Sequence, residues 1–155
     1  MSDLRAIADL YAEVDDFLEA WRDKAVADGT ATERARIEHK QRINDQAYFV
    51  LAWGQLEADI VDACRSTIRH AQTHGNWRDR RAWNLYNPDD RRLSGLSFEN
   101  RLTLVLEKGS QTWKKVLQHY SVRNQIAHGR LRSQRIDVSS VIEEFYLIQA
   151  SLARD

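Results

Sequence analysis

The chain has few residues of the kinds that interrupt helices or cross-link loops. Its 155 residues include one Pro, six Gly and one Cys. A single cysteine excludes an internal disulfide and a zinc site built from several cysteines. Cys64 lies in an apolar helical pattern with Ile60, Val61 and Ile68, so we expect a small buried side chain and not a nucleophile. The single cysteine and the lack of an apolar signal segment favour a reducing, cytoplasmic location.

A net charge and a long apolar run are also absent. Lys plus Arg number 23 and Asp plus Glu number 23, so the formal charges balance. No overall basic field attracts nucleic acid, and any RNA site must therefore be local. No apolar stretch approaches the length of a membrane span, and we expect no membrane partner.

The apolar residues that are present recur at helical spacing. They predict helices at about 3–27, 31–71, 98–108, 111–128 and 140–152. Ser97, Ser110 and Ser140 are the predicted N-caps of the last three helices. A chain of this length suits one domain, so we predict that residues 1–155 form a single all-α bundle of four or five helices.

Residues 73–96 break the helical pattern and predict a long loop. Aromatic and basic side chains alternate in it, including Trp77, Arg78, Arg81 and Trp83. Aromatics interleaved with Arg can stack on unpaired bases and hold phosphates, so these residues are candidates for RNA binding. The structural alternative is that both Trp side chains cap the core while the Arg side chains pair with aspartates of the same loop.

No metal site is predicted. His70 and His74 are four residues apart and could share a helix face, but no cysteine is near and no third ligand is clear. Gly75 and Asn76 follow directly, so this pattern predicts that the helix has ended by His74. We therefore expect two surface histidines and neither a metal nor a cofactor.

The nine residues SVRNQIAHG, from Ser121 to Gly129, carry the clearest chemical signal. Asn124 and His128 share a helix face, whereas Arg123 lies about 140° from His128 around the helix. Gly129 is a natural helix stop, which places His128 in the last turn. An imidazole that can change charge near neutral pH, beside a permanent cation and an amide, suits metal-free cleavage of an RNA phosphodiester. The alternative is a structural histidine bonded to a carbonyl at a helix end.

More basic residues follow this motif. Arg130, Arg132 and Arg135 precede the next acid, Asp137, and together with Arg123 they form a local basic patch. A charge run is commonly only a solvated surface. Beside a candidate catalytic histidine, however, it favours phosphate binding.

The run RNQIAHG resembles the R-x-x-x-x-H signature of the HEPN superfamily, the higher eukaryotes and prokaryotes nucleotide-binding domains. Arg123 and His128 occupy the two signature positions, and Asn124 is the polar residue directly after the Arg. The setting is similar as well, because the motif falls in a late helix of a small helical chain. The motif covers only a short run, while the helical context extends over most of the chain.

The resemblance implies a metal-independent endoribonuclease. His128 would act as general acid or base for attack by the ribose 2′-hydroxyl, Arg123 would bind the scissile phosphate, and Asn124 would orient one of them. The product would carry a 2′,3′-cyclic phosphate. Glu57 is a candidate for the acidic or polar residue that some members have on an earlier helix. An acid that pairs with Arg65 or faces solvent is the alternative interpretation.

The resemblance also implies partners. Since one chain supplies one clear histidine, acid and base roles would need both subunits of a homodimer with a composite active site. Similar stand-alone domains act as toxins or antiphage-defence proteins, so the predicted partners are RNA and an antitoxin or other regulatory protein. Arg130 stands where the toxin branch with a nucleotidyltransferase-like antitoxin has Tyr, so that pairing is not implied. Two alternatives remain: an inactive HEPN module that binds nucleotide, RNA or protein, and a helical protein that binds another protein through its Trp-rich loop.

Overall fold

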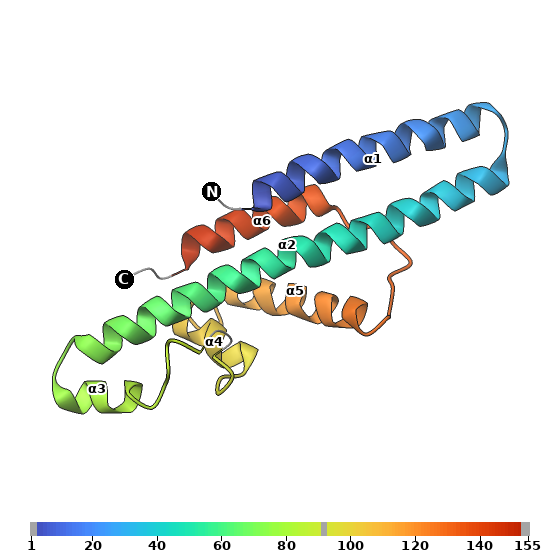
Figure 1. The fold of residues 1–155 in the computed structure, drawn as a ribbon. Coiled ribbons are helices and arrows are strands. Elements are labelled where there is room, and N and C mark those ends of the chain that lie inside the picture. Colours follow the sequence, from blue (N-terminus) through green and yellow to red (C-terminus); the bar gives the residue numbers. More distant parts are fainter. Residues whose placement is uncertain (1–2, 91–92, 153–155) are drawn as a thin grey trace. The chain divides into compact units, whose positions relative to one another are not determined.

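The computed structural model describes residues 3–90 and 93–152 (Figure 1). In this part of the chain there are six helices and no strand, which confirms the predicted all-α bundle. The helices are α1 (Leu4–Ala27), α2 (Ala31–Thr73), α3 (Trp77–Trp83), α4 (Phe98–Val105), α5 (Gln111–Ala127) and α6 (Val138–Ser151). Not one of these described helices combines the length and the apolar character needed to cross a membrane.

The chain divides into two compact units. Unit 1 holds residues 1–55 and 120–144, and unit 2 holds residues 56–119 and 145–155. Helices α2, α5 and α6 each contribute residues to both units. The end of α5, which carries the motif, belongs to unit 1, whereas α3 belongs to unit 2.

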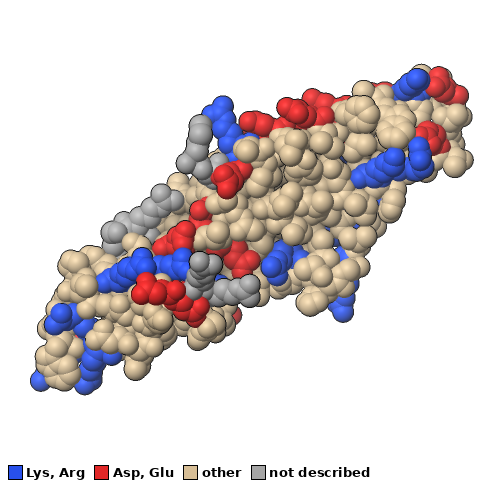
Figure 2. Space-filling view, viewed as in Figure 1, with Lys and Arg blue, Asp and Glu red and all other residues tan. Residues whose placement is uncertain are grey.

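In unit 1 an apolar stripe of α1 packs along the first part of α2. Leu4, Tyr11, Leu18 and Ala25 are buried at intervals of seven residues, a spacing that keeps side chains on one helix face. The opposite edge of α1 carries many Asp and Glu side chains (Figure 2). Gly29 adopts a φ of 68° in the turn that brings α2 back antiparallel to α1 (Figure 1). The buried apolar residues of α2 in this unit are Ile37, Phe49, Ala52 and Trp53.

The core of unit 2 is built on the second part of α2. Leu56, Ile60, Cys64 and Ile68 are buried at intervals of four residues. The Cys64 thiol donates a hydrogen bond to the carbonyl of Arg101 at 3.0 Å, and burial raises the pKa of this thiol to about 11. The thiol therefore stays protonated near neutral pH, as expected for a packing residue. The other helices contribute Phe98, Leu102, Val105, Val116, Phe145 and Ile148.

Two of the three predicted serine caps are confirmed. The Ser97 hydroxyl accepts a hydrogen bond from the backbone N–H of Asn100 at 3.2 Å, and the Ser110 hydroxyl accepts one from Trp113 at 3.1 Å. The prediction for Ser140 is wrong, because α6 begins at Val138. A different side chain caps this helix: the Asp137 carboxylate accepts bonds from the backbone N–H of Ser140 at 3.0 Å and from its hydroxyl at 2.8 Å. Aspartate and serine are comparable N-caps, so composition alone did not separate them.

Asp137→Ala should destabilise the protein by about 1 kcal/mol at neutral pH, and Ser140→Ala should cost less. The backbone and hydroxyl hydrogen bonds from Ser140 lower the pKa of the Asp137 carboxyl. A lowered pKa in the folded state gives stabilisation that is complete above the unfolded carboxyl pKa of about 3.9 and is lost as pH falls through the folded value.

Thermal unfolding of both variants and the wild type, at neutral pH and at a pH below that unfolded value, tests this prediction. The difference in Tm between wild type and Asp137→Ala should shrink in acid. An equal or larger loss for Ser140→Ala at neutral pH would instead make Ser140 the dominant cap.

The segment that we predicted as one long loop contains a helix. The Asn76 side chain accepts hydrogen bonds from the backbone N–H groups of Arg78 at 2.9 Å and Asp79 at 3.2 Å, and this cap starts α3. A helix of seven residues is too short to show an apolar period and depends on such contacts. Irregular segments precede and follow it, as the Gly, Asn and Pro residues predict.

Candidate functional site

Helix α5 ends at Ala127, directly before His128 and one residue before the predicted end. The backbone N–H of Gly129 donates to the carbonyl of Ile126 at 2.9 Å, and that of Arg130 donates to Gln125 at 2.9 Å. Gly129 has a φ of 75°, the left-handed conformation that favours glycine directly after a helix. The chain turns away after His128, and the imidazole lies exposed at the end of the helix.

His128 and Asn124 line one open hollow of about 460 Å³ in unit 1, which we name the α5 hollow. The intervals of four residues in its lining place these side chains on one helix face. Sites for small ligands commonly measure about 300–1,000 Å³, so the α5 hollow is large enough for a nucleotide. Its lining residues are Tyr120, Ser121, Asn124, Gln125, His128 and Arg130.

Arg123 is bound to the neighbouring amide. Its Nη1 donates a hydrogen bond to Oδ1 of Asn124 at 3.0 Å, and its side chain is half-buried. This bond fixes the guanidinium next to a residue that lines the α5 hollow. Of the three predicted catalytic residues, two share the hollow and the third is tied to one of them.

Tyr120 also lines the α5 hollow, which the motif by itself did not indicate. Its ring lies 5.9 Å from the ring of Trp53, centroid to centroid, and Trp53 is completely buried. This packing fixes the phenol ring at the wall of the hollow. The available signal in the sequence was spacing, because Tyr120 precedes Asn124 by four residues and His128 by eight.

Two of the basic residues after the motif, Arg130 and Arg132, have exposed side chains that make no ion pair within residues 3–90 and 93–152. Arg130 lines the α5 hollow, and Arg132 follows on the same connection. The backbone N–H of Arg132 donates to Oε1 of Gln46 at 2.9 Å, and Nε2 of Gln46 donates back to the Arg132 carbonyl at 3.4 Å. Because Gln46 is a buried residue of α2, these bonds hold the connection against α2, while the Arg132 side chain remains exposed to solvent.

Arg135 is engaged differently from the other basic residues. Its Nε donates to Oδ2 of Asp45 at 2.9 Å, and its Nη2 donates to Oδ1 of Asp45 at 3.0 Å and to Asp15 at 2.5 Å. The Asp45 carboxylate is fully buried and also accepts the Tyr11 hydroxyl at 3.0 Å. We therefore assign Arg135 to the structure of unit 1 and leave it out of the proposed RNA site, where the sequence had placed it.

The cluster of Arg135, Asp45, Asp15 and Tyr11 raises the pKa values of its two hydrogen-bond donors, Arg135 and Tyr11. The hydrogen bond to Asp45 raises the pKa of Arg135 further above its ordinary value, so the guanidinium is permanently charged. Burial, followed by the negative charge of Asp45, raises the pKa of Tyr11, so its hydroxyl remains a donor. The positive charge of Arg135, which the sequence suggested for phosphate binding, is thus paired with carboxylates of the protein itself.

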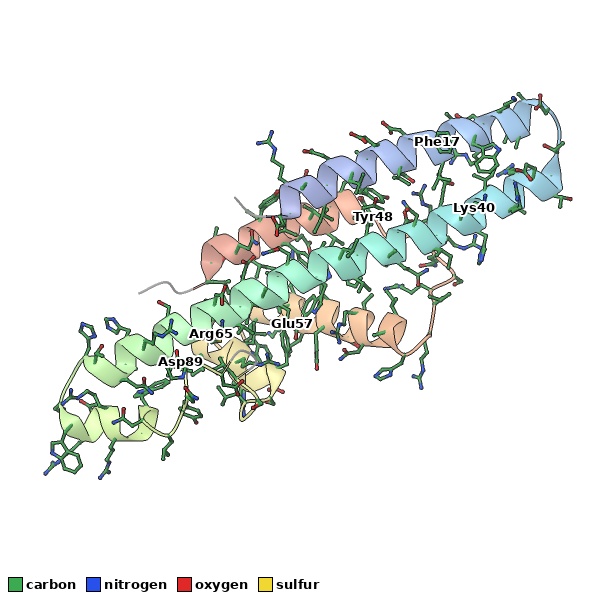
Figure 3. All side chains as sticks on the ribbon, in the orientation of Figure 1. Phe17, Lys40, Tyr48, Glu57, Arg65 and Asp89 are labelled. Carbon is green, nitrogen blue, oxygen red and sulfur yellow. The ribbon has the colours of Figure 1, made fainter. Side chains whose placement is uncertain are left out.

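The remaining candidates lie in unit 2. Trp77, Arg78 and Arg81 are exposed on α3, whereas Trp83 is half-buried with its ring 6.2 Å from that of Tyr86. Glu57, labelled in Figure 3, is a half-buried residue of α2 in unit 2 and is not among the lining residues of the α5 hollow.

The two neighbouring histidines are surface residues, as predicted. Their rings stack at 3.9 Å between centroids, and both side chains are exposed. His70 borders a second hollow of about 470 Å³, where Arg65 pairs with Asp62 at 2.9 Å. Across residues 3–90 and 93–152, no group of three or more His, Cys, Asp or Glu side chains is arranged to hold a metal ion.

Comparison with protein-family models, with curated proteins and with solved structures gave no match to this chain. The resemblance to HEPN domains therefore stays a prediction that depends on the motif and its helical setting. Function has to be argued from the α5 hollow, the residues that line it and the charges around it.

Proposed function

We propose that the protein is a metal-independent endoribonuclease of the HEPN type that cleaves RNA at the α5 hollow. The observation that carries this proposal is the exposure of His128 in a hollow that it shares with Asn124. A purely structural histidine at a helix end is expected to be buried or bonded to a carbonyl. His128 is exposed, and its side chain has no partner within residues 3–90 and 93–152.

The chemistry follows from the side chains present. The ribose 2′-oxygen attacks phosphorus and loses its proton, and the bond from phosphorus to the 5′-oxygen breaks as that oxygen gains a proton. His128 performs one of these proton transfers. Arg123 binds the non-bridging oxygens and stabilises the growing negative charge, and the 3.0 Å bond from Arg123 to Asn124 orients the guanidinium. The products are a 2′,3′-cyclic phosphate and a 5′-hydroxyl.

Phosphate binding at this place needs cationic side chains. The end of α5 presents backbone carbonyls and the negative end of the helix dipole, which repel an anion. Arg123, Arg130 and Arg132 offset that field, and Arg130 and Arg132 lie within four residues of His128 in the sequence. The local positive charge supports RNA binding although the charges of the whole chain balance.

The proposal includes a second copy of the chain. A single imidazole cannot take the 2′-proton and donate to the leaving oxygen in one step. Each copy of the chain has one His128 in its own α5 hollow, so two copies supply the two imidazoles. We therefore propose a homodimer in which two α5 hollows form a composite site. A role as a toxin or antiphage-defence protein, restrained by an antitoxin or other regulatory partner, belongs to the same proposal.

The decisive experiment is cleavage of single-stranded RNA in EDTA. A matched RNA in which the ribose at the cleaved position lacks its 2′-hydroxyl serves as the control. We expect cleavage of the first RNA with a 2′,3′-cyclic phosphate end and no cleavage of the second at that position. Cleavage of both RNAs at the same position would exclude attack by the 2′-hydroxyl.

A non-catalytic nucleotide- or RNA-binding module is the second candidate. The observation that favours it is the hydrogen bond between Arg123 and Asn124, because an arginine held by its neighbour can serve structure alone. This candidate predicts binding of RNA or nucleotide without cleavage. Intact RNA after incubation with a folded dimer that binds it would favour the module over the nuclease.

A further inference from the structure

Helix α3 presents an aromatic ring to solvent. Trp77 is 62% exposed, which rules out the interpretation that this side chain caps the core. The guanidinium of Arg81 lies over the ring at 5.6 Å from its centroid, and this cation–π contact holds the indole against its own helix. A large flat ring is thus fixed at the surface of unit 2.

The arginines of α3 also lack the partners that the structural alternative required. Asp79 accepts a hydrogen bond from the Asn76 side chain, Asp89 accepts one from Arg69 at 2.8 Å, and Asp90 accepts the Ser94 hydroxyl at 2.6 Å. The Asp89 carboxylate is labelled in Figure 3. Within the described ranges 3–90 and 93–152, no carboxylate forms an ion pair with an arginine of α3, namely Arg78, Arg80 or Arg81.

The charge of this helix is therefore local and uncompensated. The seven residues of α3 contain three Arg and a single Asp. Figure 2 shows blue Lys and Arg atoms set among tan side chains at the α3 end of unit 2, whereas the red atoms gather beside the irregular segment that follows. Arginine forks that are not neutralised within the protein favour phosphate.

Hydrogen bonds fix both ends of α3. The side-chain amide of Gln72 on α2 donates to the carbonyl of Trp83 at 3.0 Å and to that of Tyr86 at 2.8 Å. These bonds fix the C-terminal end of α3, while the Asn76 cap fixes its start. Trp83 is half-buried next to Tyr86, so it supports the helix and is not part of the exposed face.

We propose that the exposed face of α3 binds an unpaired segment of RNA, with one base stacked on Trp77 and the flanking phosphates held by Arg78 and Arg81. The partner chemistry follows from the face itself. A flat exposed ring recognises another flat ring, and uncompensated arginines recognise a polyanion; single-stranded nucleic acid combines both features. That the nucleic acid is RNA rests on the proposed function. The α5 hollow would cleave the strand, and α3 would add affinity for its unpaired part.

The test measures binding and not cleavage. The probe is a fluorescent RNA of about 12 nucleotides, within the site sizes of single-strand binders, with 2′-O-methyl riboses that cannot be cleaved. Trp77→Leu should weaken binding roughly tenfold, and Trp77→Phe should weaken it less because the smaller ring still stacks. A duplex of the same sequence offers no unpaired base, so the Trp77 variants should bind it equally well.

Arg78→Gln/Arg81→Gln tests the phosphate contacts. Its matched control is Arg34→Gln/Arg36→Gln, which removes two exposed arginines near the start of α2 in unit 1. Loss of two contacts to a single strand should reduce the slope of log affinity against log salt by about 1.4. The control double variant should keep the wild-type slope. All variants must first show the wild-type circular dichroism spectrum and Tm.

The outcomes separate this inference from the proposed nuclease activity. Weaker single-strand binding by the Trp77 and Arg78/Arg81 variants supports the α3 site, even where wild-type protein leaves ordinary RNA intact. Unchanged affinity and salt slope in folded variants overturn the α3 site, even where wild-type protein cleaves RNA. Equal losses of affinity for the single strand and for the duplex would mean that α3 attracts nucleic acid through its charge alone. That result would overturn base stacking on Trp77.

Discussion

His128→Ala should lower the rate of RNA cleavage by about 10²–10⁴-fold, the usual contribution of a positioned acid or base. The reason is that the proposed composite site would lose its proton-transfer group in each copy. Stability should hardly change, because the imidazole is exposed and lies after the last residue of α5. The measurement is single-turnover cleavage in EDTA together with Tm and oligomeric state.

Three further variants divide the roles within the motif. Arg123→Ala should lower the rate by about 10²–10³-fold through loss of charge stabilisation, and Arg123→Lys should fall between it and wild type because lysine keeps the charge but not the planar fork. Asn124→Ala should act more weakly, since it removes only the 3.0 Å bond that positions Arg123.

Gln125→Ala is the matched control, because Gln125 lines the same hollow but cannot transfer a proton near neutral pH. It should cleave at close to the wild-type rate. A loss of activity equal to that of His128→Ala would mean that any change in the hollow disrupts RNA binding. Full activity of folded His128→Ala would remove the histidine from the mechanism.

Arg135→Met should destabilise unit 1 by roughly 2–4 kcal/mol, a large share of a typical net stability of about 5–15 kcal/mol. The variant leaves the fully buried Asp45 carboxylate with the Tyr11 hydroxyl as its remaining partner in the cluster. We place the effect below that of a completely buried ion pair because the Arg135 side chain is 39% exposed. For a chain of this size, Tm should fall by about 10 °C.

Arg132→Met is the matched control for this prediction. It makes the same substitution three residues earlier in the same connection, but Arg132 contacts Gln46 through its backbone N–H and carbonyl. Its Tm should stay within about 2 °C of wild type, since exposed substitutions usually change stability by less than 0.5 kcal/mol. Equal Tm values for the two variants would show that the cluster around Asp45 contributes little.

A double variant tests the physical cause. Asp45→Leu/Arg135→Met removes the buried charge together with its partner, so it should recover part of the stability that Arg135→Met loses. Failure to recover any stability, with Tm as the measure, would attribute the loss to packing and not to an unpaired carboxylate. The Asp15 carboxylate is common to both variants and cancels in the comparison.

The cluster also connects stability to the proposed site. Arg135 lies on the connection between α5 and α6 that carries Arg130 and Arg132, and its ion pairs fasten that connection to α1 and α2 within unit 1. The residue that looked like a ligand for phosphate thus holds the exposed arginines in place. Loss of this anchor should loosen the segment directly after His128.

Much of the fold was readable from the sequence because helices are local. The apolar period at Leu4, Tyr11 and Leu18 predicted α1 with its bounds correct to one residue, and Gly129 predicted the end of α5. The interactions that decide these features join residues within about one or two turns, so the spacing of two residues in the sequence fixes their relative position in the helix. The position of His128 at a helix end followed from the same local rule, whereas its exposure was decided by the folded structure.

Only the tertiary structure decided what the charged and aromatic side chains contact. Arg135 meets Asp45 from 90 residues and Asp15 from 120 residues away, and no local pattern contains such a pairing. Trp77 and Arg78 could equally have packed against the core or faced solvent, and the choice depended on which carboxylates were already engaged by Asn76, Arg69 and Ser94. The sequence by itself determined the helices and the position of the candidate motif, because backbone hydrogen bonds and apolar periodicity act over short distances. Packing determined which cations remain available to a ligand, because ion pairs and burial depend on residues that only the folded chain brings together.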